Sequence, residues 1–117
     1  MSVDEAIHDL LNFSTDIRGV AVLDQGGDVV AVAPAAAADA LGGTAASLWA
    51  EAQLCAGLSD STRLDHVVVQ DETGAVGMVR EGDRLIVAVT GPRPAVGLLL
   101  FDLRTCLRDA YPDEVEP

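Results

Sequence analysis

The apolar positions at the start of the chain recur at helical spacing. Ser2 followed by Glu5 is a capping-box signature, in which the two residues satisfy free donors at a helix start. Apolar residues then follow one another along one helical face: Val3, Ile7, Leu10 and Leu11. This pattern predicts a helix from about Val3 to Phe13.

Five later segments are short, apolar and rich in β-branched residues, as strands are. They cover residues 18–23, 29–33, 64–70, 75–80 and 84–90. The first two are separated by DQGGD and the last three by DETG and EGD, which are hairpin-type turns. GPRP ends the last segment, and helical spacing resumes from Ala95 to Ala110. The sequence therefore predicts two hairpin regions and a C-terminal helix.

The central segment, residues 40–59, carries a single charged residue, Glu51. We expect it to be helical from about Gly43, with one stripe facing the core: Leu41, Ala45, Leu48, Ala52 and Cys55. The opposite side is also apolar, because it holds Ala46, Ala50 and Leu54 with Leu58 beside them. A helix that is apolar all round has to be covered all round, so this segment predicts an association surface.

The elements follow one another in the order α-β-β-α-β-β-β-α. This order predicts an α+β fold of three layers, with a five-stranded, mostly antiparallel sheet. At 117 residues, the chain is long enough for one domain with its own core, so we expect a single domain over residues 1–117 with an acidic tail from about 111.

Candidate interface residues come from the central segment and from the strand at 64–70. Leu54 and Leu58 point away from the predicted core stripe, whereas Trp49 is either a core residue or an interface anchor. Glu51 is either a solvated charge or a pairing point for a basic group. The predicted dimer or partner interface comprises Ala46, Trp49, Ala50, Glu51, Gln53, Leu54, Leu58, Val67 and Val69.

The charge balance argues against several classes of function. The chain has 19 acidic and 7 basic residues and a formal net charge of -12, whereas binding to a phosphate backbone needs clustered positive charge. We therefore expect no nucleic-acid partner. Lysine is absent, so the chain has no P-loop lysine and no Schiff-base chemistry. The acidic excess favours a partner with a basic patch.

No residue set predicts catalysis or a cofactor. Cys55, Asp65 and His66 contain the groups of a nucleophile set, but Asp65 and His66 are strand neighbours and point to opposite faces. The cysteines, Cys55 and Cys106, are predicted to be buried thiols, with a disulfide as the alternative. His8 is expected at the surface, and the spacing predicts no metal site. We expect a protein that is not an enzyme and has no cofactor.

The N-terminus and the hydropathy pattern predict a cytoplasmic location. The mean hydropathy is +0.30, but no apolar run approaches the roughly 18 residues of a membrane span. MSVDEAIHDLL is acidic where a secretory signal is basic. We expect no direct membrane insertion, and a chain this apolar is typical of an oligomer.

The order of elements, together with LLNFSTDIRGVAVLDQGGDVVAVA near the start, resembles the Roadblock family, which is related to a dynein light chain and to bacterial and archaeal regulators of Ras-like GTPases. Further matching landmarks are TAASLWAEAQLCAGL, RLDHVVVQ, the turn glycine Gly74, RLIVAV, and Gly97 opening LLLFDLRTCLRDA. The resemblance implies a Roadblock-like, profilin-like fold. Gly42 and Gly43 depart from the pattern and shorten the central helix at its start.

The resemblance also implies a function. In the family, the third strand pairs with that of a second copy, and the two central helices lie side by side as a platform for a small GTPase. We therefore expect a non-enzymatic homodimeric scaffold that binds a Ras-like small GTPase through its central helix. A small-molecule sensor domain is the alternative, because such sensors share an antiparallel sheet flanked by helices.

Overall fold

The computed structural model describes residues 2–14, 16–24, 28–34, 48, 50–52, 65–70 and 72–111. Its elements are α1 (Val3–Phe13), β1 (Ile17–Leu23), β2 (Val29–Ala33), β3 (His66–Gln70), β4 (Ala75–Glu81), β5 (Arg84–Thr90) and α3 (Val96–Ala110). Leu48 and residues 50–52 of the central segment are also helical. The predicted α+β class and the element order α-β-β-α-β-β-β-α are confirmed.

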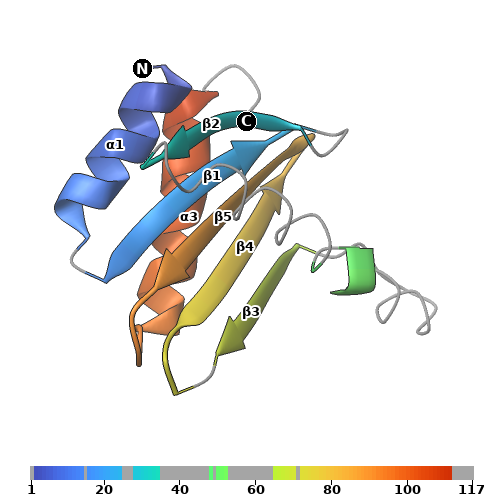
Figure 1. The fold of residues 1–117 in the computed structure, drawn as a ribbon. Helices are drawn as coiled ribbons and strands as arrows, with labels where there is room; N and C mark the ends of the chain where they lie inside the picture. Colours follow the sequence, from blue (N-terminus) through green and yellow to red (C-terminus); the bar gives the residue numbers. More distant parts are fainter. Residues whose placement is uncertain are drawn as a thin grey trace.

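The strands form one five-stranded sheet in the order β2-β1-β5-β4-β3. Every neighbouring pair is antiparallel, so β1 and β5 lie in the middle of the sheet and β2 and β3 are its edges (Figure 1). The chain reaches the central strand β5 last, after it has formed both edges. Strand β5 therefore completes the sheet, because it pairs with β1 of the N-terminal hairpin on one side and with β4 of the β3–β4 hairpin on the other.

Helix α1 begins as its sequence predicts. The Ser2 hydroxyl oxygen accepts a hydrogen bond from the Glu5 backbone N–H at 3.2 Å and donates one to the Glu5 carboxylate at 3.1 Å. Asp4 and Glu5 also place negative charge at the positive end of the helix dipole. Such a cap contributes about 1 kcal/mol. It fixes the helix so that Ile7 and Leu10 point into the core.

Helices α1 and α3 pack on the same face of the sheet (Figure 1). Their apolar stripes meet the side chains of four strands in one cluster: Ala6, Ile7, Leu10, Ile17, Val20, Val22, Ala31, Ala33, Val79, Ile86, Ala88, Leu99, Leu103, Cys106 and Leu107. Ile7 and Leu103 are completely buried. Full burial of such a side chain stabilises the fold by roughly 1.5–3 kcal/mol, so this cluster is the main core.

The other face of the sheet carries a smaller cluster, formed by Ala21, Leu23, Met78 and Val87. Leu48 of the central segment packs against this cluster, and so does Val67 of β3. The sheet therefore has helical residues on both of its faces, as a three-layer arrangement requires.

The observed element bounds differ from the predicted ones at a few ends. Strand β1 begins one residue early, at Ile17, because the Gly91 N–H donates to the Asp16 carbonyl oxygen at 3.0 Å and so extends the ladder with β5. Strand β3 begins at His66, although the Asp65 carbonyl oxygen still accepts a hydrogen bond from Arg80. Leu64 lies outside the described residues. Helix α3 begins at Val96 instead of Ala95, which is its N-cap.

Replacing Gly74 with alanine should destabilise the fold. A Cβ atom there would overlap the Thr90 carbonyl oxygen, and backbone in the β4–β5 ladder cannot move aside as a flexible side chain can. We expect Gly74→Ala to lower the free energy of unfolding by about 1–3 kcal/mol, measured by urea denaturation.

Gly97→Ala is the matched control, because a Cβ atom at Gly97 meets nothing within 4 Å. Alanine is favoured over glycine in a helix by up to about 1 kcal/mol, so this variant should be as stable as the wild type or slightly more so. Equal unfolding midpoints for the two variants would contradict the close approach at Gly74.

Candidate interaction surface

Strand β3 is an edge of the sheet that α1 and α3 do not cover. Helix α1 packs over β1 and β2, and α3 packs over β4 and β5, whereas β3 lies beyond both helices (Figure 1). All five residues of β3 are exposed or half-buried. On its inner side β3 pairs with β4, from His66 opposite Val79 to Gln70 opposite Ala75. Among the described residues, no strand pairs with its outer side.

The side chains of β3 alternate between the two faces of the sheet, as predicted. Val67 lies opposite Met78, and Val69 lies opposite Val76, so both face the smaller cluster. Val67 is half-buried there, whereas Val69 remains 48% exposed. A large apolar side chain at an open sheet edge is a site where another chain can add. His66 belongs to the opposite face, on the side of α3.

The described part of the central segment has an inward and an outward side. Leu48 and Ala52 are half-buried, and Leu48 packs on the same cluster as Val67. Ala50 and Glu51 are exposed. The structure therefore places Ala50, Glu51, Val67 and Val69 on one side of the sheet. The other predicted interface residues lie outside the described residues and stay predictions: Ala46, Trp49, Gln53, Leu54 and Leu58.

Arginines of α3 reach toward the β3–β4 edge. The Arg104 guanidinium Nη2 lies 3.3 Å from Nδ1 of His66, and Arg108 pairs with the Glu81 carboxylate at 3.2 Å. Both contacts are exposed, so each contributes at most about 1 kcal/mol. Their main consequence is that positive charge lies on the α3 side of this edge.

Of the residues considered for catalysis, the two that the structure describes, Asp65 and His66, do not form a pair. Asp65 precedes β3 on the face opposite His66, so the carboxylate does not orient the imidazole. Cys55 lies outside the described residues. His8 is exposed, and its Nδ1 lies 2.7 Å from the Asp4 carbonyl oxygen within α1. In the described part of the chain, no three His, Cys, Asp or Glu side chains come close enough together to hold a metal ion.

Cys106 of α3 is a free, buried thiol. Burial, together with the smaller effect of the nearby carboxylates of Asp109 and Asp9, raises its pKa from 9.0 to about 12. Because the thiolate is the reactive form, the raised pKa and the burial both lower the reactivity of this thiol at neutral pH. The sequence prediction of a buried thiol therefore holds for Cys106.

Among the helices in the described ranges, none combines the length and the apolar character that a membrane span needs.

The sequence analysis missed a set of large apolar side chains that are exposed away from β3. Phe13 ends α1, and Leu98 and Phe101 lie near the start of α3; these three are 86%, 59% and 64% exposed. A signal for them was present in LLLF at residues 98–101. Four consecutive helical residues span about 300° of a helix, so they cannot all face the sheet.

Comparison by sequence finds no relative: the chain matches no protein-family profile and no curated protein. Comparison by structure finds several similar proteins. A Roadblock/LC7 domain from Streptomyces avermitilis superposes with a TM-score of 0.82 at 14% identity, covering 97% of this chain and 98% of that one.

Two structures of MglB are also similar. One, described as MglB with a tetrameric arrangement, has a TM-score of 0.77 and 20% identity over 97% of this chain and 90% of its own. The other, from Myxococcus xanthus, has a TM-score of 0.68 and 14% identity over 98% and 91%. The resemblance to Roadblock that the sequence suggested is therefore confirmed for the fold.

The raised pKa of Cys106 predicts a specific thiol reactivity. In a Cys55→Ser variant, which keeps Cys106 as its one cysteine, iodoacetamide at pH 8 should alkylate the native protein at least about a hundredfold more slowly than the urea-unfolded protein. Native alkylation at the rate of the unfolded chain would contradict the burial of this thiol.

The same shift makes stability depend on pH. The folded pKa lies above the unfolded value, so the stabilising contribution is complete below pH 9.0 and is lost as the pH rises toward about 12. The urea midpoint of the Cys55→Ser variant should fall over this range more steeply than that of a variant in which Cys106 is also replaced by alanine.

Proposed function

We propose that this protein is a non-enzymatic, homodimeric Roadblock-type module that binds a Ras-like small GTPase through its central helix. The observation that carries the proposal concerns the edge strand β3. The side chains of Val67 and Val69 in this strand face the same side of the sheet as the exposed Ala50 and Glu51. An edge that can accept a strand and a neighbouring exposed helix side form one continuous surface. The fold, which is that of Roadblock/LC7 domains, supports the same interpretation.

The proposed dimer forms by strand addition. Two copies of β3 pair antiparallel about a two-fold axis, so that the sheets of both copies become continuous. This pairing satisfies the outer backbone groups of β3 and covers the half-exposed Val69. It also brings the two central helices together in this proposal, because Leu48 of each copy packs on the same cluster as Val67 of its own β3.

The other edge is less suited to this role. Strand β2 is packed under α1, and its last three residues, Ala31–Ala33, are buried or half-buried. Only Val29 and Val30 at its start are exposed, at 39% and 44%. All five residues of β3 are exposed or half-buried in the part of the chain that the structure describes, so this strand is more accessible to a second copy.

The proposed GTPase site is the outer side of the paired central segments. Ala50 is small and exposed, so a partner surface can approach the helix backbone closely there. Glu51 beside it offers a carboxylate to a basic group of the partner. The net charge of -12 favours encounter with a basic face. The identity of the partner as a Ras-like GTPase comes from the Roadblock resemblance.

Lysine at the centre of the proposed dimer interface should separate the copies. We expect Val69→Lys to give a monomer, because the charged side chain has to be desolvated at the paired edge. The molar mass in solution, measured by light scattering after size exclusion, checks this. Val29→Lys changes the other edge strand in the same way and should remain a dimer. A wild-type monomer, or a monomeric Val29→Lys variant beside a dimeric Val69→Lys variant, would contradict the proposed edge.

An arginine in place of Ala50, on the exposed side of the central helix, should weaken binding of the GTPase without separating the two copies of the proposed dimer. For Ala50→Arg we expect at least about a tenfold loss of affinity for a Ras-like GTPase encoded near this gene, measured by calorimetry with a GTP analogue bound. Ala95→Arg is the matched control, since Ala95 is exposed at the start of α3 on the other side of the sheet. Unchanged binding by a dimeric Ala50→Arg variant would exclude this helix side as the docking site.

A further inference from the structure

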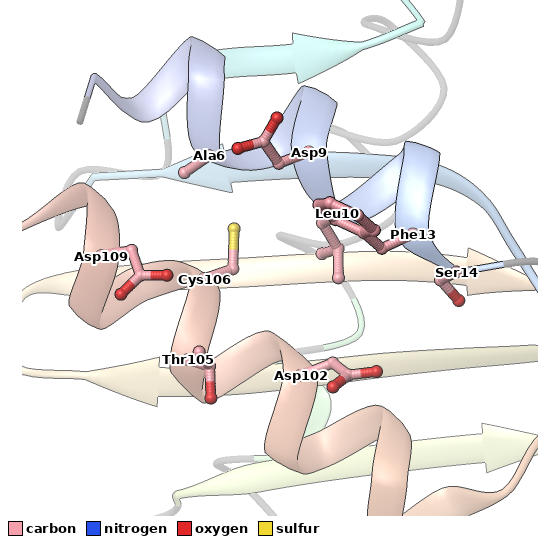
Figure 2. Close-up of a pocket in the computed structure, with 9 residues that line it drawn as sticks. All are labelled: Ala6, Asp9, Leu10, Phe13, Ser14, Asp102, Thr105, Cys106 and Asp109. Atoms are coloured by element: carbon pink, nitrogen blue, oxygen red, sulfur yellow. The ribbon is translucent and has the colours of Figure 1, made fainter.

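A groove lies between α1 and α3, on the face of these helices that points away from the sheet (Figure 2). Its volume is about 460 Å³. It is lined by Ala6, Asp9, Leu10, Phe13, Ser14, Asp102, Thr105, Cys106 and Asp109. This groove is separate from the surface proposed for the dimer and the GTPase, which lies on the other side of the sheet and at β3.

The lining residues follow the helical repeat on both walls. On α1 they are Ala6, Asp9, Leu10 and Phe13, and on α3 they are Asp102, Thr105, Cys106 and Asp109. Each set has the spacing i, i+3, i+4, i+7, which is a single stripe along two turns of a helix, or about 10 Å. One such stripe on α1 and one on α3 line the two walls of the groove. A groove between two helices is a place where a third helix can pack.

Large apolar side chains border one end of the groove. Phe13 is 86% exposed at the end of α1. A second hollow adjoins the groove, because Ser14 and Asp102 line both. Leu98 lines this second hollow and is 59% exposed. Phe13 lines the groove and Leu98 lines the adjoining hollow, and exposed large apolar residues at adjoining hollows indicate a binding site more strongly than scattered ones do. Phe13 and Leu98 therefore provide an apolar anchor point.

The charged side chains of the groove are all acidic. Asp9 comes from one wall and Asp102 and Asp109 from the other. Within the described ranges, none of the three makes an ion pair or a side-chain hydrogen bond. The arginines of α3 do not neutralise them, because Arg104 and Arg108 contact His66 and Glu81 at the β3–β4 edge.

The effect of this charge is visible at the floor of the groove. Figure 2 shows the sulfur of Cys106 pointing from α3 into the space between the helices, with Asp9 and Asp109 on either side of it. Both carboxylates raise the pKa of this thiol in addition to its burial. The groove is therefore a region of uncompensated negative potential.

We infer that the groove between α1 and α3 is a docking site for a basic amphipathic helix of a partner protein. The apolar side of such a helix packs on Phe13 and Leu98, and its lysines or arginines pair with Asp9, Asp102 and Asp109. A second copy of this chain is a poor occupant, because its net charge of -12 repels the groove. A membrane with anionic lipids is repelled for the same reason.

A model peptide tests the inference without knowledge of the partner. The probe is a fluorescein-labelled amphipathic helix of leucine and lysine, with a peptide of leucine and glutamate as its counterpart. Fluorescence anisotropy with the wild-type protein should show saturable binding of the lysine peptide and none of the glutamate peptide. Absence of saturable binding at about 100 μM protein, or equal binding of both peptides, would overturn the inference.

Two charge variants distinguish the groove from general attraction to an acidic protein. Asp102→Lys and Asp83→Lys change the net charge equally, but Asp83 is exposed in the β4–β5 turn and does not line the groove. We expect about a tenfold weaker affinity for Asp102→Lys and about the wild-type affinity for Asp83→Lys at 150 mM salt. An equal loss in both variants would show non-specific attraction and overturn the inference.

Two apolar variants test the anchor. Phe13→Ser and Val30→Ser each remove an exposed apolar side chain, so both are expected to fold, and only Phe13 borders the groove. The peptide affinity should fall about fivefold or more for Phe13→Ser and stay unchanged for Val30→Ser. Sedimentation with neutral phosphatidylcholine vesicles tests a membrane as the alternative occupant of the groove. If the wild-type protein binds vesicles, the Phe13→Ser variant does not, and neither binds the peptide, the surface belongs to a membrane and the inference is overturned.

Discussion

Helices α1 and α3 pack over only four of the five strands, and this constraint determines how the molecule can associate. Helix α1 spans β1 and β2, and α3 spans β4 and β5, so the strand beyond them, β3, has one hydrogen-bonded side and little cover. The central strands β1 and β5 are buried between two apolar clusters. A stable centre with an accessible edge strand is suited to growth by addition of a strand, because the addition requires no change in the core.

The basic and the acidic side chains of α3 lie on different sides of the helix. Arg104 and Arg108 point toward the β3–β4 edge, whereas Asp102 and Asp109 point into the groove beside α1. Between them, Leu99, Leu103 and Leu107 face the sheet. The spacing of these residues along one helix thus produces a packed stripe and two flanks of opposite charge. A molecule with a strong overall acidic excess can in this way present locally different surfaces to different partners.

The sequence predicts the elements better than it predicts the surfaces. Helix α1, β2 and β5 have the bounds that the sequence indicates, because a capping box, hairpin glycines and alternating side chains are local signals. The groove could not be predicted in the same way. Asp102 and Phe13 are far apart in the sequence, and only the packing of α1 against α3 brings them to one hollow. Likewise, the apolar character of the central segment indicates that it needs cover but does not identify the molecule that supplies it.

The two proposed surfaces are expected to act independently. The groove lies on α1 and α3, and the β3 edge lies beyond β4; between them is the main core, in which Ile7, Leu103 and Val79 are completely buried. Such a core is close-packed and resists small displacements, so a ligand on one side does not shift the other unless the sheet has a second stable arrangement. A partner helix in the groove should therefore leave the equilibrium of the proposed dimer unchanged. A protein with this property joins two partners by proximity, as a scaffold does, and its binding energies add.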